Sequence, residues 1–134
     1  MLGKHLIKTW AKQQTVVAMS SAEAELYAGS KAGSEALGMQ TWLHDLGWEA
    51  PVRMHMDSSA ALSLLHREGL GKTKHIAIQH LWLQEVIKHK RMVVLKIAGE
   101  SNPSDLMTKN LTCDRITYLM RLLGHWFVEG RLFE

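Results

Sequence analysis

Little cysteine, little proline and no long apolar run are present in this 134-residue sequence. Its single cysteine, Cys113, excludes an intramolecular disulfide framework and fits a reducing, intracellular compartment, either cytoplasmic or nuclear. No apolar segment approaches the roughly 20 residues of a membrane-spanning helix, and the first four residues do not begin a signal peptide. We therefore expect no membrane partner. Because no repeat or linker is visible either, residues 1–134 are predicted to form one domain.

Several common catalytic motifs are also missing. Gly71-Lys72-Thr73 lacks the glycine that a phosphate-binding loop carries five residues earlier, and no His-Glu-x-x-His zinc motif occurs. The charge balance is only mildly basic: 16 Lys and Arg stand against 13 Asp and Glu, a net charge of +3. This balance suits a polyanionic partner but is far from that of a protein that coats DNA.

Residues 20–27 predict the start of a long helix over residues 21–46, which Gly47 should end. Ser20 can cap the helix, and Glu23 can complete a capping box. An apolar stripe is expected along one side of the helix, formed by Ala28, Ala32, Ala36, Met39, Leu43 and Leu46.

Glu25 is the acid of this helix that a local role does not explain. At about 100° per residue it lies roughly 20° from Ala32 around the helix axis, whereas Glu23 lies about 180° away, on the predicted solvent side. Glu25 is therefore expected to point inward. A carboxylate on a packing face needs a partner, a proton or a metal ion.

The remaining pattern alternates between strands and helices. Strands are predicted at residues 5–10, 52–57 and 92–97, with an extended segment at 15–19. Helices are predicted from Ser58 or Ser59 to residue 65, over 75–89 and over 113–123, with a further helix entry at Asn102-Pro103. This order indicates an α/β fold in which a sheet carries parallel, right-handed crossovers and flanking helices.

Three acids follow the predicted strands: Glu25, Asp57 and Asp105. Open parallel sheets place their sites at the carboxyl ends of the strands, so one edge would gather all three. Clustered carboxylates repel one another unless a cation joins them, and oxygen ligands suit Mg²⁺ or Mn²⁺. Purely structural roles stay open for two of these acids: the helix dipole would favour Asp105 in a first helical turn, and Asp57 could be a helix N-cap.

Four motifs resemble the ribonuclease H domain of copia-type LTR retrotransposon polyproteins. They occupy residues 17–28 (VAMSSAEAELYA), 56–61 (MDSSAA), 72–78 (KTKHIAI) and 102–109 (NPSDLMTK), in the family's order and within about residues 10–111. The resemblance implies an RNase H-like fold with a mixed sheet, and hydrolysis of the RNA strand of RNA–DNA hybrids with two Mg²⁺ ions.

The resemblance also implies roles for individual residues. Glu25, Asp57 and Asp105 match three of the family's four metal-binding carboxylates. The cationic side chains of the later motifs are expected to meet the hybrid backbone, where positive charge gives sequence-independent affinity; they are Lys72, Lys74, His75 and Lys109. For Lys72 and Lys74, a solvated basic loop is the alternative.

The chain departs from the family in its N-terminal part. Residues 1–22 contain no Asp or Glu, so the family's first aspartate has no counterpart, and the first two strands of the five-stranded sheet are expected to be missing. Two consequences follow: weakened metal binding, and an exposed sheet edge that predicts a homodimer. Alternatively, residues 5–10 close the edge in a monomer. The second functional hypothesis is a catalytically inactive, nucleic-acid-binding or self-associating retroelement remnant.

Overall fold

The computed structural model describes residues 1–12, 14, 17–67, 78–128 and 131–133. The chain divides into two compact units, one formed by Gln14–Ile97 and the other by Met1–Gln13 with Ala98–Glu134. The sequence-based expectation of a single domain over residues 1–134 stays a prediction.

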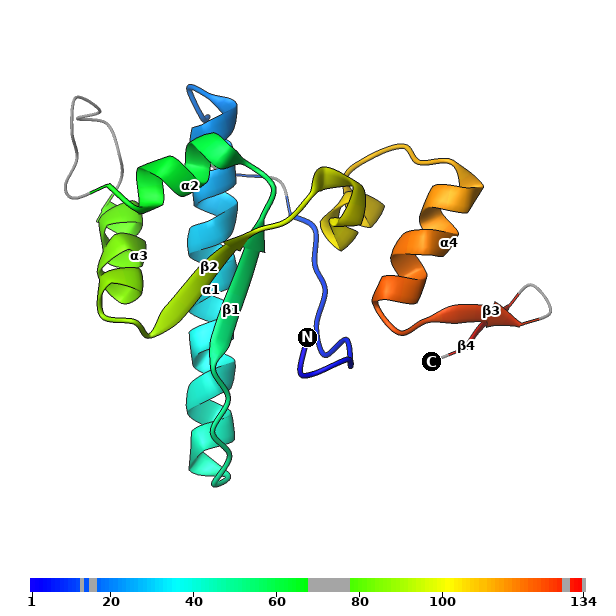
Figure 1. Ribbon diagram of the computed structural model, residues 1–134, viewed down its shortest axis with the longest axis horizontal. Helices are drawn as coiled ribbons and strands as arrows, with labels where there is room; N and C mark the ends of the chain where they lie inside the picture. The colour runs from blue at the N-terminus through cyan, green and yellow to red at the C-terminus, as the bar shows by residue number, and fades with distance from the viewer. Residues whose placement is uncertain (13, 15–16, 68–77, 129–130, 134) are drawn as a thin grey trace. The chain divides into compact units, whose positions relative to one another are not determined.

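The Gln14–Ile97 unit is a mixed α/β structure built around two parallel strands (Figure 1). The strands β1 and β2 pair in register from Val52 with Met92 to Met56 with Lys96, as the alternation of strands and helices predicted. Its elements in chain order are α1 (Ser21–Asp45), β1 (Val52–Met56), α2 (Ser59–Leu65), α3 (Ile78–Lys88) and β2 (Met92–Lys96).

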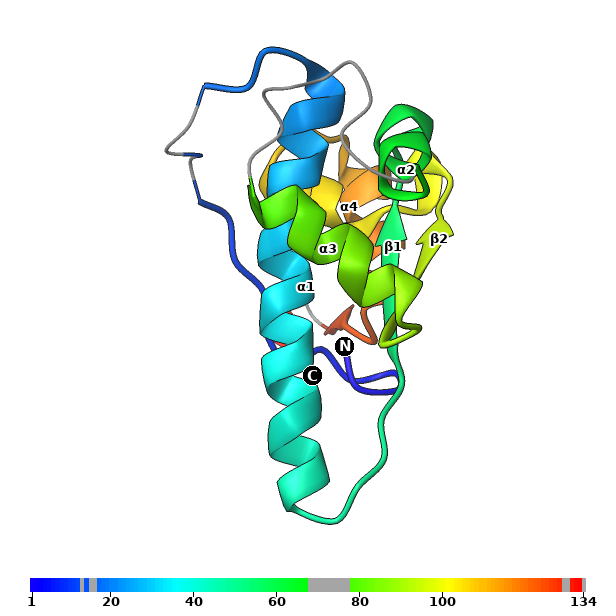
Figure 2. The same ribbon diagram turned by 90° about the vertical axis from the view of Figure 1, so that its left-hand side faces the viewer.

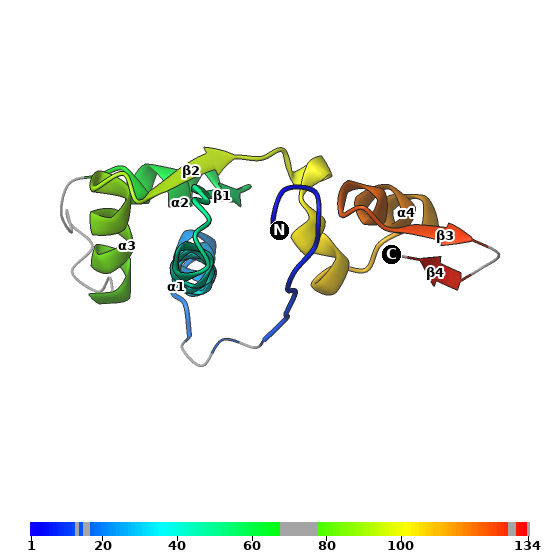
Figure 3. The ribbon, with the colours of Figure 1, turned by 90° about the horizontal axis from the view of Figure 1, so that it is seen from below.

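One face of the sheet carries the core. Figure 3 shows α1 and α3 on the same side of β1 and β2, and Figure 2 shows that α1 runs opposite to β1. The strands alternate as expected: Met54 and Met56 are buried, whereas Arg53 and His55 are exposed. The inward side chains of the strands join those of the helices in one cluster; its best-buried members are Leu26, Ala61, Leu65, Leu83 and Met92.

Helix α1 approaches the sheet closely because glycines face the strands. A Cβ atom added at Gly29 would lie 3.3 Å from Met56 Cε, and one at Gly33 would lie 3.0 Å from Met92 Cε. Small residues here let methionine side chains of the sheet pack directly on the helix backbone.

The apolar stripe predicted for α1 is confirmed only in part. Leu43 is buried as predicted, but Ala28 and Leu46 are exposed, and most of the buried face is formed by Leu26, Gly29, Ser30, Gly33 and Leu37. This face is turned by roughly a quarter turn or more from the predicted one. The predicted stripe left out two leucines of the buried face, and it gave no place to glycine and serine, although Gly29 and Gly33 make the close contacts with the sheet.

The other unit contains η1 (Gly99–Ser101), η2 (Pro103–Met107), α4 (Cys113–Leu122), β3 (Trp126–Val128) and β4 (Arg131–Phe133). Strands β3 and β4 pair antiparallel (Figure 1). Leu119 of α4 is fully buried, and the guanidinium of Arg115 donates to the carbonyl oxygen of Gly99 at 3.1 Å, which ties α4 to η1.

Several predicted boundaries are confirmed, and other expectations are wrong. Helix α1 ends before Gly47 and α4 ends before Gly124, as predicted. The predicted strand at residues 5–10 does not form. The only pairing there is an isolated bridge between Leu2 and His5. The β3–β4 pair was missed, although four of its six residues are aromatic or β-branched: Trp126, Phe127, Val128 and Phe133. In the described ranges, no helix has both the length and the apolar character to cross a membrane.

Candidate functional site

Asp57 lies immediately after β1, at the carboxyl end of the parallel pair. The backbone N–H of Ile97 donates to the carbonyl oxygen of Met56 at 2.9 Å, so the pairing extends to the last residue before Asp57. Ser58, not Asp57, is the N-cap of α2, and its Oγ accepts from the N–H of Ala61 at 3.2 Å. The half-buried Asp57 therefore occupies the strand–helix junction without serving as the cap.

Lys96, the last residue of β2, is a functional candidate that the sequence analysis missed. Its Nζ donates to the backbone carbonyl oxygen of Asp57 and, at 2.8 Å, to Ser59 Oγ. The ammonium group thus holds the junction that carries Asp57. Its position at the end of the second parallel strand was the signal that could have found it, because the ends of such strands meet at one edge.

Glu25 lies toward the same end of the sheet. It precedes Gly29 by four residues, so it lies about 6 Å further along the axis and roughly 40° around it. Gly29 contacts the side chain of Met56, the residue before Asp57. Glu25 lies one helical turn before Gly29 and is therefore near the level of Asp57 along the sheet. Glu25 is half-buried, at the border of the buried face of α1.

The predicted stripe placed Glu23 on the solvent side of α1, and this prediction is wrong. Glu23 is half-buried, its N–H donates to Ser20 Oγ at 3.2 Å, and its Oε2 accepts from the N–H of Met19 at 2.8 Å. The reciprocal capping arrangement is therefore present, with the returning bond made to Met19 rather than to Ser20. Glu23 has a local structural role, as the sequence predicted.

Beside this cap, α3 buries a histidine. His80 is almost completely buried; its Nδ1 lies 3.3 Å from Ser30 Oγ, and its ring centroid lies 4.8 Å from that of Tyr27. Among the described residues, its Nε2 has no hydrogen-bond partner. Burial lowers the pKa of His80 below its ordinary value of 6.5, and the charge of Glu23 opposes that shift. Near neutral pH the ring is therefore uncharged.

Asp105 belongs to the other unit and is buried within η2. Its Oδ1 lies 2.8 Å from Lys109 Nζ, so an ion pair compensates the buried carboxylate. The Oδ1 of Asn102 accepts from the N–H of Ser104 at 3.2 Å, and Pro103 is the first residue of η2, which confirms the predicted entry. The two predicted site residues of the fourth motif therefore bind each other.

The predicted nucleic-acid contacts Lys72, Lys74 and His75 lie outside the described residues. Within the part of the chain that is described, no three Asp, Glu, His or Cys side chains lie close enough together to hold a metal ion. Glu25 and Asp57 belong to one unit and Asp105 to the other. The donor set nevertheless fits Mg²⁺ or Mn²⁺ in kind, because it consists of carboxylate oxygens.

Cys113 is exposed at the first residue of α4. All five tryptophans, at positions 10, 42, 48, 82 and 126, are also exposed and lie outside the core, which leaves an interface role open.

Comparison with known proteins relates the chain to a transposon. It is 30% identical over 116 residues to the retrovirus-related Pol polyprotein from transposon TNT 1-94 of Nicotiana tabacum. The match covers 85% of this chain and 9% of that polyprotein. No family model matches the chain, and no solved structure matches it. The resemblance to retrotransposon polyproteins is thus confirmed, and the chain is homologous to one segment of a transposon-encoded Pol polyprotein.

Proposed function

We propose that this chain is the ribonuclease H segment of a copia-type polyprotein and hydrolyses the RNA strand of RNA–DNA hybrids. The observation that carries the proposal is the position of Asp57, directly after the first of two parallel strands and within the motif MDSSAA. Ligand sites of parallel sheets lie at this end. Glu25 lies toward the same end, and the similarity to a Pol polyprotein supports the same biological context.

Glu25, Asp57 and Asp105 are the carboxylates that would hold Mg²⁺ or Mn²⁺. Bound there, the ions would supply an activated water and would stabilise the leaving oxygen. The chain's own residues prepare the site: Lys96 fixes the backbone of Asp57, and Lys109 neutralises Asp105. Because Lys109 and a metal ion would compete for the carboxylate of Asp105, we expect weak metal affinity.

Cleavage of a labelled RNA–DNA hybrid in Mg²⁺ or Mn²⁺ tests the proposal. Asp57→Asn should lower the rate by at least about a hundredfold, because it removes a charged metal ligand without changing shape. Asp45→Asn is the matched control: Asp45 is exposed at the end of α1 and should be dispensable. Hybrid binding without any metal-dependent cleavage would contradict the nuclease and support an inactive, nucleic-acid-binding remnant. Duplex DNA is a further control substrate, and its cleavage would indicate an integrase-type activity instead of a ribonuclease H.

The basic motif residues extend the proposal to substrate binding. Lys72, Lys74, His75 and Lys109 are proposed to meet the phosphate backbone of the hybrid. Lys109 could do so only in competition with its ion pair to Asp105. Each lost phosphate contact should reduce the slope of log affinity against log salt concentration by about one.

A homodimer through the sheet edge is the second part of the proposal on partners. In the described part of the Gln14–Ile97 unit the sheet has two strands, and its outer face exposes Val93 and Leu95. Parallel sheets are normally covered on both faces, which favours a partner here. Size-exclusion chromatography with light scattering should give the mass of a dimer. A monomer at all concentrations would contradict it.

A further inference from the structure

Three helices of this protein end in the same hydrogen-bonded turn. After α1, the backbone N–H of Gly47 donates to the carbonyl oxygen of His44, and that of Trp48 donates to the carbonyl oxygen of Leu43. After α4, the N–H groups of Gly124 and His125 donate in the same way to the carbonyl oxygens of Arg121 and Met120. After α3, those of Lys90 and Arg91 donate to the carbonyl oxygens of Ile87 and Val86. This is the Schellman motif, in which one residue adopts the left-handed conformation.

The end of α3 differs from the other two because lysine replaces glycine. The left-handed residues are Gly47 and Gly124, both with φ of 82°, and Lys90 with φ of 56°. Lys90 is the only non-glycine residue with positive φ among the described residues. A side chain is unfavourable in this conformation, and glycine is the usual solution. At this helix end the protein therefore displays a cationic side chain at a position where glycine would be favoured.

Lys90 belongs to an exposed basic turn, Lys88-His89-Lys90-Arg91, between α3 and β2. These four residues form the basic turn. Its His89 lies beside an acid, because His89 Nε2 is 3.2 Å from Glu85 Oε2.

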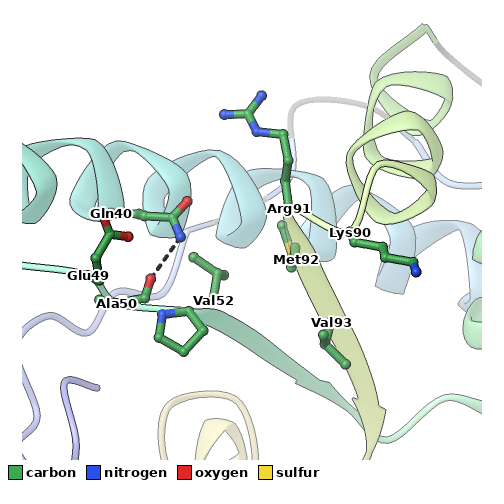
Figure 4. Close-up of a pocket in the computed structure, with 9 residues that line it drawn as sticks. Gln40, Glu49, Ala50, Val52, Lys90, Arg91, Met92 and Val93 are labelled. Carbon is green, nitrogen blue, oxygen red and sulfur yellow. Dashed lines mark hydrogen bonds between the residues drawn. The ribbon is translucent and has the colours of Figure 1, made fainter.

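The basic turn borders a pocket of about 370 Å³, whose other walls are the start of β1 and helix α1. Figure 4 shows Lys90 and Arg91 projecting in different directions from the start of β2, while the amide of Gln40 points at the carbonyl oxygen of Ala50, to which it donates at 2.7 Å. Apolar side chains line the pocket between these groups: Pro51, Val52, Met92 and Val93. The acid on its wall, Glu49, lies 3.7 Å from His44 Nε2.

We infer that the basic turn and this pocket form a second contact for the sugar-phosphate backbone of a nucleic acid, at the amino end of the sheet. Strands of five residues place it about 16 Å from the end that carries Asp57. The cations suit phosphates, and the apolar wall suits the sugar that joins them. The inference rests on the proposed function, since it adds a second anchor for the same substrate.

Metal-free equilibrium binding tests this site independently of catalysis. The affinity of the full chain for a fluorescent RNA–DNA hybrid is measured by anisotropy in a chelator, between about 50 and 200 mM salt. Lys90→Gly and Arg91→Gln should each weaken binding about tenfold at the lowest salt concentration and reduce the salt slope by about one. Lys90→Arg should bind like the wild type.

The thermal midpoint provides the second readout. Because glycine is favoured at this φ, Lys90→Gly should raise Tm by about 3–5 °C while it weakens binding. Lys31→Gln, which removes one exposed cation from the middle of α1, is the matched control and should change binding little. Unchanged binding by Lys90→Gly, an unchanged or lower Tm, or an equal loss in Lys31→Gln would each overturn the inference. Absent cleavage with these binding changes intact would instead count only against the nuclease.

Discussion

The two ends of the β1–β2 sheet carry opposite chemistry. At the carboxyl end, acidic side chains lie beside helix starts that are capped as the sequence predicts, and one lysine is hydrogen-bonded to the strand–helix junction. At the amino end, the exposed cations Lys90 and Arg91 border a pocket, and Lys90 adopts a conformation that suits glycine. Local sequence rules are therefore obeyed where they position acids, and one is broken where a cation is presented to solvent.

This difference suggests a division of labour within one small unit. The carboxyl end would perform metal-dependent chemistry, and the amino end would hold the nucleic acid. If the division is correct, substitutions at one end should change cleavage without changing metal-free binding, and substitutions at the other should do the reverse.

The largest effect is expected from the paired acids at the start of α1. Glu25→Gln should lower the cleavage rate at least about a hundredfold, because a metal-binding charge is lost, whereas Glu23→Gln should keep the rate within about threefold, because Glu23 only caps the helix. Initial rates on a labelled hybrid measure both. Equal losses in the two variants would show that Glu25 has no special role at the carboxyl end.

A smaller effect is expected from the lysine that was found only in the structure. Lys96→Met should reduce kcat about tenfold, because the backbone of Asp57 loses a donor that fixes it. KM should change less, and Lys96→Arg should recover most of the rate. A Lys96→Met enzyme with wild-type kcat would contradict a positioning role for this side chain.

The packing between helix and sheet can be tested at a glycine near the amino end. Gly33→Ala should lower the free energy of unfolding by about 1 kcal/mol, because its Cβ would lie 3.0 Å from Met92 Cε and 3.1 Å from Leu83 Cδ1. Gly38→Ala, where the added Cβ meets nothing within 4 Å, should instead raise it by about 0.5–1 kcal/mol. Urea unfolding measures both, and stabilisation by Gly33→Ala would contradict tight packing there.

The smallest effect concerns pH. Since burial lowers the folded-state pKa of His80, the unfolded chain binds a proton more readily. The stability from neutral His80 is present above pH 6.5 and is lost as the pH falls below 6.5 toward the lowered pKa. His80→Gln should flatten this dependence in urea unfolding series. Identical pH profiles for wild type and His80→Gln would contradict the assignment.

Much of the local structure could be predicted because its signals are short in range. Ser20 with Glu23, Asn102 with Pro103, and the glycines after α1 and α4 mark helix ends through backbone groups that must find partners nearby. The strict alternation of β1 likewise predicted which side chains face the core. By contrast, the full buried face of α1 could not be predicted from apolarity, because it includes Gly29 and Gly33, whose close contacts depend on methionines of distant strands.

The candidate site shows the same limit. Its acids could be selected from motifs and strand ends, yet neither the hydrogen bonds of Lys96 to the Asp57 junction nor the ion pair of Lys109 with Asp105 follows from spacing alone. Both depend on which side chains the folded backbone brings within reach.

Sequence alone was enough to predict the order of elements from α1 to α4, most helix ends, and the relationship to a transposon polyprotein, because these depend on neighbouring residues or on motif identity. Only the tertiary structure decided which side of α1 is buried, which cation holds Asp57 and where Lys90 is displayed. The physical reason is that packing and charge pairing are settled between segments far apart in the chain, whereas caps and alternation are settled within a few residues.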